Sequence, residues 1–235
     1  GSYDGTTAST YTADPRNQTA SIDDGTITVT PTWDDNGALT NDATRTYVYD
    51  AENHLLFVEP TTPADGDTRA TYAYDAVGRR ARRVVETYTA ATTSWSTTST
   101  THYFHHGWSV VEEIDDNGTP TADYLNGRAL DEPLAAVIAD VNDDDPIYFH
   151  QNAIGNVELI TDEDGVVLER YRYDAQGNVT VLDADGVPTG GGPETAMSPY
   201  LFTGRRFDAE SGLYYFRNRY YSPLLGKFIS PDPLD

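Results

Sequence analysis

The stretch Gly212–Pro233, GLYYFRNRYYSPLLGKFISPDP, places five aromatic rings in eight positions and ends in Pro-Asp-Pro. We interpret its first half as one alternating strand, because side chains two positions apart share a face of a strand. One face would carry Tyr214, Phe216, Asn218 and Tyr220, and the other Leu213, Tyr215, Arg217, Arg219 and Tyr221. Residues 223–226 predict a turn, after which a strand returns over residues 227–230. Rings on both faces need cover on both, so the stretch predicts hairpins packed on hairpins. A stacking platform for sugar rings is the alternative.

A short Tyr-Asp unit recurs upstream of this stretch. It reads YVYDAENHLL from Tyr47, YAYDAVGRRA from Tyr72 and YRYDAQGNVT from Tyr171. Each begins with two rings on one face of a strand. The Asp then favours a turn, and a Gly or Asn three residues later tolerates positive φ. The unit therefore predicts a β-hairpin, and its irregular spacing argues against a strict solenoid.

Other segments are less decisive. Residues 128–140, RALDEPLAAVIAD, are the best candidate for a short helix. Pro133 and two β-branched residues oppose a helix, so a strand is an equal alternative for this segment. Residues 61–67 and 188–198 are typical of loops. Residues 90–100 are rich in Thr and Ser and fit either a loop or a hairpin with a short turn.

The composition excludes several classes of function. The 235 residues contain 38 acidic and 15 basic side chains, for a net charge of −23, which disfavours nucleic acid and anionic membranes as partners. The absence of cysteine excludes disulfides and thiolate chemistry. No apolar run is long enough for a membrane span, so membrane insertion is not expected. Gly1-Ser2 resembles the remnant of a cleaved tag, which suggests a fragment of a longer chain.

The Tyr-Asp units resemble the YD repeats of the RHS family. Residues 200–234 resemble the RHS repeat-associated core domain, and residues 148–179 are similar to the segment before it in that family. The positions that match the family pattern are Tyr49, Asp50, Tyr74, Asp75, Gly78, Tyr173, Asp174, Gly177, Gly204, Gly212, Leu213, Tyr214, Tyr215, Arg217, Arg219, Tyr220, Tyr221, Asp232 and Pro233.

The resemblance implies a large bacterial protein that is extracellular or located at the cell surface. In that family the repeats coil into a hollow β-shell, and variable C-terminal domains, often toxins, follow the core domain and can be enclosed. The expected partners are therefore the upstream repeats and the C-terminal cargo of the same parent chain.

Some family members also carry an aspartyl autoprotease, whose signature is two Asp-Pro-x-Gly motifs. Here Asp232-Pro233-Leu234 matches the first motif, but Asp235 replaces its Gly and no second motif follows. Two-carboxylate hydrolysis needs both acids in one site, so Asp232 alone is a weak catalytic candidate. We therefore expect no enzymatic activity from this chain, while autoproteolysis in the parent stays an alternative.

Two clusters of side chains, one acidic and one of histidines, are candidate metal sites. Asp140, Asn142 and Asp144 alternate like calcium ligands, but the spacing fails the EF-hand pattern, so we expect solvated acidic turns and no cofactor, with weak calcium binding as the alternative. His102, His105 and His106 cluster, and His150 occupies a similar position in a second hairpin. A structural role is favoured for these histidines.

We therefore predict an all-β protein of successive antiparallel hairpins that form one curved sheet, part of a shell wall. Residues 3–198 would form the repeat region and residues 199–235 the core C-terminal segment of one continuous domain. Exposed sheet edges could support self-association. The less acidic C-terminal segment could dock onto the acidic wall. The predicted function is structural; the rival is an adhesion module that binds glycans through exposed Tyr and Trp, with Trp33, Trp95 and Trp108 as candidates.

Overall fold

The computed structural model describes residues 10–16, 18–23 and 28–232. These residues form three antiparallel β-sheets and three short 3-10 turns. Gly1-Ser2 and Pro233 lie outside the described residues, so the tag remnant and the last motif position are not placed. The all-β prediction is confirmed.

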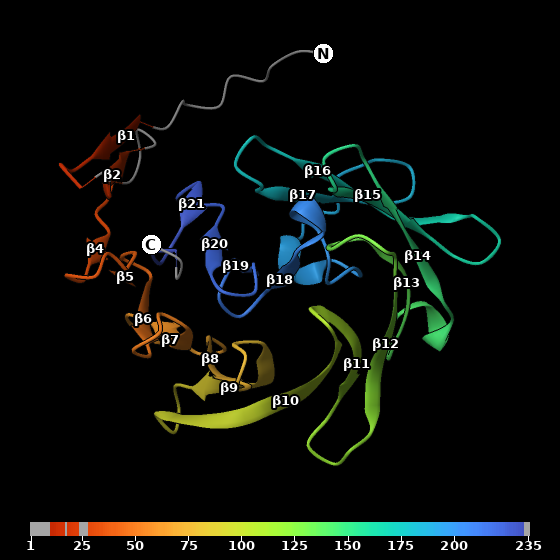
Figure 1. Cartoon of the computed structure of the whole chain (residues 1–235), viewed down its shortest axis with the longest axis horizontal. Helices are drawn as coiled ribbons and strands as arrows, with labels where there is room; N and C mark the ends of the chain where they lie inside the picture. Colours follow the sequence, from red (N-terminus) through yellow and green to blue (C-terminus); the bar gives the residue numbers. More distant parts are fainter. Residues whose placement is uncertain (1–9, 17, 24–27, 233–235) are drawn as a thin grey trace.

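The largest sheet has fourteen strands, and each strand pairs with its neighbours in sequence. We call this sheet the wall. It comprises β4 (Thr32–Trp33), β5 (Leu39–Asn41), β6 (Arg45–Tyr49), β7 (Leu55–Pro60), β8 (Thr68–Tyr74), β9 (Arg80–Thr89), β10 (Ser94–His106), β11 (Ser109–Ile114), β12 (Pro120–Asn126), β13 (Pro133–Ile138), β14 (Ile147–Gln151), β15 (Val157–Thr161), β16 (Val167–Tyr173) and β17 (Val179–Leu182). Figure 1 shows that the wall bends into an open arc.

Two smaller sheets complete the molecule. The N-terminal sheet holds β1 (Thr10–Ala13), β2 (Thr19–Asp23) and β3 (Thr28–Val29). The inner sheet holds β18 (Arg206–Asp208), β19 (Leu213–Tyr215), β20 (Tyr220–Ser222) and β21 (Lys227–Phe228). The inner sheet lies within the concave side of the arc (Figure 1). The 3-10 turns are η1 (Asn142–Asp144), η2 (Pro193–Thr195) and η3 (Phe202–Gly204).

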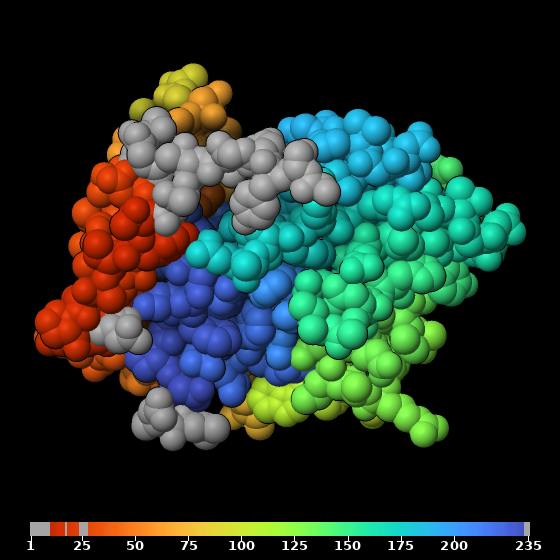
Figure 2. Space-filling view, turned by 90° about the horizontal axis from the view of Figure 1, so that it is seen from above, coloured from red at the N-terminus to blue at the C-terminus, as the bar shows by residue number. Residues whose placement is uncertain are grey.

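The structure refines the prediction of a single sheet. The chain leaves the wall after β17 and turns inward to build the inner sheet, which is not hydrogen-bonded to the wall as a further strand. The N-terminal sheet approaches the far end of the wall, where the Tyr11 hydroxyl donates to Gln176 Oε1 at 3.1 Å. Figure 2 shows the inner sheet (dark blue) at the surface between the N-terminal strands (red) and β15–β16 (cyan).

The inner sheet also corrects the single-strand interpretation of residues 213–221. Residues 213–215 and 220–222 are two strands of a hairpin, in which Tyr214 pairs with Tyr221 and Tyr215 pairs with Tyr220. The prediction that Tyr214 and Tyr220 share a face is therefore wrong, because cross-strand partners share a face instead. The chain reverses where Arg217 takes a φ of 67°.

The ambiguous segments are strands. Residues 133–138 form β13, so the helical alternative for this segment is wrong. Residues 90–93 make the turn of the long β9–β10 hairpin, in which Ser94 pairs with Thr89. The predicted turn at residues 223–226 and the returning strand at Lys227 are confirmed by β20 and β21.

The inner sheet contributes to two hydrophobic cores. In the first, Leu213, Tyr220, Leu225 and Ile229 pack with buried side chains of β5–β8, such as Leu55. In the second, Leu201 and Tyr214 pack with buried side chains of β12–β17. Each half of the wall therefore buries its concave face against the same C-terminal segment, residues 199–232.

Candidate functional site

The Tyr-Asp turns share one geometry, which the Asp side chain builds. In the turn at Asp75, one carboxylate oxygen accepts the backbone N–H groups of Val77 and Arg79 at 3.0 and 2.9 Å, while Gly78 takes a φ of 82°. Burial opposes ionisation here, but these hydrogen bonds and the Arg79 side chain lower the pKa of Asp75 below its usual value. The same bond to the residue four positions on recurs at Asp34, Asp50, Asp115, Asn152, Asp162, Asp174 and Asp183. The Asp-turn prediction is thus confirmed by geometry.

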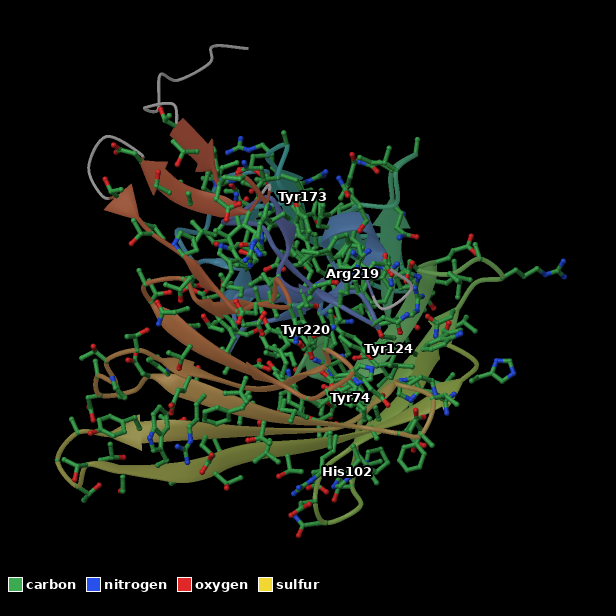
Figure 3. The ribbon with its side chains drawn as sticks, turned by 60° about the vertical axis from the view of Figure 1, so that its left-hand side comes forward. Tyr74, His102, Tyr124, Tyr173, Arg219 and Tyr220 are labelled. Carbon is green, nitrogen blue, oxygen red and sulfur yellow. The ribbon has the colours of Figure 1, made fainter. Side chains whose placement is uncertain are left out.

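The tyrosines that precede these turns use their hydroxyls inside the molecule. Tyr74 donates to the Leu55 carbonyl at 2.7 Å and Tyr173 to the Val157 carbonyl at 2.6 Å. Tyr49 reaches across to the Ile229 carbonyl at 3.3 Å. The Tyr74 hydroxyl also lies 3.4 Å from the Tyr220 hydroxyl, and Figure 3 labels both residues in the central group of side chains. These rings are structural members of the interface between the wall and the C-terminal segment.

A buried ion pair joins the wall to the inner sheet at Arg80. Its guanidinium donates to both carboxylate oxygens of Asp208, with Nη2 at 3.1 Å from Oδ1, and to the Tyr220 hydroxyl at 3.1 Å. The side chains of Arg80 and Asp208 are only 1% and 0% exposed. A buried charge needs such pairing, because desolvation is otherwise very costly. The Tyr215 ring lies 4.3 Å from the guanidinium.

Two further pairs repeat this arrangement on either side. Arg206 of β18 donates to both oxygens of Glu113 on β11, with Nη2 at 3.1 Å from Oε2. Arg83 of the wall lies 3.3 Å from Glu210, which also accepts the Tyr72 hydroxyl at 3.0 Å. Burial raises the pKa of Tyr72 well above its usual value, and the Glu210 charge adds to this effect, so the hydroxyl stays a donor.

A fourth contact joins two arginines to one carboxylate. Asp131, in the loop before β13, lies 2.6 Å from Arg217 Nη2 and 2.8 Å from Arg205 Nη2. Burial lowers the pKa of Arg205 to about 10, with Asp131 opposing and Arg217 reinforcing the shift. Gly204 lies against this loop, since a Cβ there would meet the Asp131 carbonyl at 2.3 Å.

These pairs modify the predicted docking of a basic segment on an acidic wall. The pairs of Arg206 with Glu113 and of Arg205 and Arg217 with Asp131 follow that prediction. The pairs of Arg80 and Arg83 run in the opposite direction, from the wall to acids of the C-terminal segment. The interface is therefore reciprocal. Sequence reasoning missed six residues here, because no local pattern distinguishes them from other charged residues: Arg80, Arg83, Glu113, Asp131, Asp208 and Glu210.

The weak catalytic candidate, Asp232, lies at the end of the described chain. Its Oδ2 is 2.9 Å from Arg219 Nη2, within the same segment. Pro231 and Asp232 lie beside the turn tips that carry Asn53 and Gly78. Arg219 also stacks on the Phe228 ring at 3.8 Å, so it anchors the chain as it leaves β21.

The metal candidates close a tight loop. The Asp144 carboxylate accepts the backbone N–H of Asp140 at 2.8 Å, and both residues, like Asn142, take positive φ. The described residues hold no cluster of three or more His, Asp or Glu side chains suited to a metal. His102 contacts Asp116 at 3.1 Å, away from Tyr220 (Figure 3).

The three tryptophans lie on different elements. Trp33 donates to the Thr19 carbonyl at 3.0 Å, and Trp95 packs against Tyr88 near the tip of the β9–β10 hairpin. Trp108 follows β10 and is 40% exposed. The described residues therefore do not place the three rings on a common platform. None of the helical turns in the described parts of the chain is long and apolar enough to cross a membrane.

Comparison with known proteins decides the family. The model described as "RHS Repeat" matches residues 152–188. The chain is 32% identical over 219 residues to a tRNA3(Ser)-specific nuclease WapA of Bacillus spizizenii, which covers 92% of this chain and 8% of that protein. It is 28% identical to double-stranded DNA deaminase toxin A of Burkholderia cenocepacia, over 81% of this chain and 14% of that protein. The chain belongs to the RHS/YD-repeat family.

A similar fold is also seen in a solved structure. A crystal structure of TcdB2-TccC3 matches 96% of this RHS chain and 12% of that chain, with a TM-score of 0.63 and 19% identity. This similarity shows the fold alone. The RHS segment spans only about a tenth of these relatives, so the nuclease and deaminase names describe much longer proteins.

Proposed function

We propose that this chain is a non-enzymatic wall module of a large, secreted or surface-located bacterial RHS protein, and that residues 199–232 act as an internal plug. The observation that carries the proposal is the inner sheet, which completes both hydrophobic cores and exchanges buried ion pairs with the wall. The apolar concave face of the wall would be exposed to water, at a cost in free energy, unless another segment covered it. The plug fills that face and fixes where the following chain begins.

The position of Asp232 supports the second half of the proposal. Arg219 holds Asp232 beside the turn tips of β6–β7 and β8–β9, so any following segment starts at the rim of the concave side. In the parent protein this arrangement would retain a C-terminal effector within or against the shell, even after a break in the chain. The upstream repeats would continue the wall from its β4 edge.

Whether residues 199–232 stay bound to the wall without a covalent link can be tested on this chain. A specific protease site inserted after Gly190, in the exposed stretch before η2, allows the wall and the plug to be separated covalently. We expect two masses under denaturing conditions and a single complex in native mass spectrometry. Dissociation of the nicked protein under native conditions would contradict the plug.

Enclosure is tested on the full-length parent. Its denatured and native masses are compared, together with the sensitivity of the C-terminal segment to added protease. We expect that segment to be protected until the plug is weakened by Arg206→Met. A C-terminal segment that is digested as fast in the intact protein as in isolation would contradict enclosure and leave a scaffold or adhesion role.

A further inference from the structure

A cavity between β9–β12 and the C-terminal segment is unusually rich in arginine. Five of the fourteen arginines of this acidic chain line it, namely Arg79, Arg80, Arg205, Arg206 and Arg217. Trp108, which is 40% exposed, also lines it. A concentration of positive charge in a chain of net charge −23 needs a local explanation.

The carboxylates bonded to these arginines do not balance their charge. Asp75 pairs with Arg79, Asp208 with Arg80, and Glu113 with Arg206. The remaining two arginines, 205 and 217, share Asp131. Five guanidinium groups therefore face four carboxylates, and one positive charge is left over. Uncompensated charge in a partly buried site is costly, so an anion is the expected complement.

Unpartnered donors point to the same place. Tyr103 lines the cavity, is 6% exposed, and its hydroxyl has no hydrogen-bond partner among the described residues. The Nε groups of Arg80, Arg206 and Arg217 are also buried without a hydrogen-bond partner among those residues. Native proteins leave few such groups, and each one needs a reason. His105, also in the lining, has its pKa lowered by burial and then by Arg79, consistent with a positive potential.

We propose that this cavity binds one small carboxylate. The excess of a single charge matches a monoanion better than a phosphate or sulfate dianion. The cavity encloses about 50 Å³, and one water needs about 10–15 Å³. A carboxylate group fits in that space. Arginine is also the side chain best suited to carboxylate, because its planar donors match the two oxygens. The carboxylate comes from a free small molecule or from an acidic side chain of another segment.

The test follows Trp108 during a titration with sodium acetate. The chain is labelled with 5-fluorotryptophan, and the Trp108 resonance is assigned by its loss in Trp108→Phe. We expect that resonance alone to shift and to saturate, because Trp33 and Trp95 lie elsewhere. No saturable shift, or equal shifts of all three resonances, would overturn the proposal. A capped Gly-Glu-Gly peptide is titrated in the same way, and its binding would identify a protein side chain as the source.

Two variants should move the affinity in opposite directions. Arg217→Gln removes the excess charge and should weaken acetate binding by about tenfold or more, whereas Asp131→Asn adds one net positive charge and should tighten it by a similar factor. Arg82→Gln is the matched control, because Arg82 is exposed and outside the cavity. Equal affinity in Arg217→Gln and Arg82→Gln would reject the site. That comparison still decides if Asp131→Asn does not fold.

Discussion

We expect the Arg80→Met variant to unfold at a much lower denaturant concentration than the unaltered protein. The change leaves the Asp208 carboxylate fully buried, with its next guanidinium atoms, from Arg83 and Arg206, at 3.7 Å. Removal of one partner of a buried pair costs about 3–5 kcal/mol. For a chain of this size that loss lowers Tm by about 6–20 °C. The measurement is equilibrium unfolding in urea, followed by tyrosine and tryptophan fluorescence, with calorimetry for Tm.

Arg82→Met provides the control from the neighbouring position. Arg82 is 44% exposed and lies 3.6 Å from Asp116 on the surface, so its loss should change stability by about 0.5 kcal/mol or less. The double variant Arg80→Met/Asp208→Asn removes both charges and should recover most of the loss. The reasoning is refuted if Arg80→Met is as mild as Arg82→Met, or if the double variant is less stable than the single one.

Three further predictions test the turns and the plug. Gly177→Ala should destabilise by more than Gly186→Ala, because both glycines have positive φ but a Cβ at 177 would lie 2.7 Å from the Phe202 ring, while none meets an atom at 186; urea midpoints compare the two, and equal losses would contradict contact with the plug. Tyr72→Phe removes one of the two hydrogen-bond partners of the buried Glu210 carboxylate, the other being Arg83, and should cost about 1–3 kcal/mol in the same assay. The pKa of Asp75 is lower in the folded state than in the unfolded state, so its contribution to stability is present above the unfolded pKa of about 3.9 and is lost as pH falls through the folded pKa. Asp75→Asn should therefore reduce the loss of stability that is measured below about pH 4. The same loss of stability below about pH 4 in the variant and the unaltered protein would count against this prediction.

The wall could be predicted from the sequence because its signals are local. An Asp with Gly or Asn three residues later needs only five residues to close its turn, as at Asp75 and Asp174. Paired tyrosines before the turns at Asp50, Asp75 and Asp174 then specify which face of the strand is buried. These local signals therefore predicted the hairpins, while the curvature of the sheet was expected from the RHS resemblance. The segment of β13 remained ambiguous, because only Pro133 and two β-branched residues argued against a short helix there.

The inner sheet could not be predicted to the same depth. Alternation of rings from Leu213 to Tyr221 fits one long strand as well as two short ones, and the reversal depends on Arg217 at positive φ, a conformation that few residues other than glycine adopt. The ion pairs were also hidden. Arg80 and Asp208 are 128 positions apart, and 38 acidic residues offer many alternative partners. Tertiary packing selects among them.

Under the proposed plug role of residues 199–232, a chain break beyond the inner sheet would leave the wall closed. All the buried ion pairs between the wall and the C-terminal segment involve residues up to Arg217, and both cores take their last member from Ile229 or earlier. Arg219 then holds Asp232 within the segment itself. Among the described residues, these buried contacts between the segment and the wall thus precede Asp232. The wall would keep its buried face whatever happens to the chain that follows, which separates the stability of the module from the fate of its cargo.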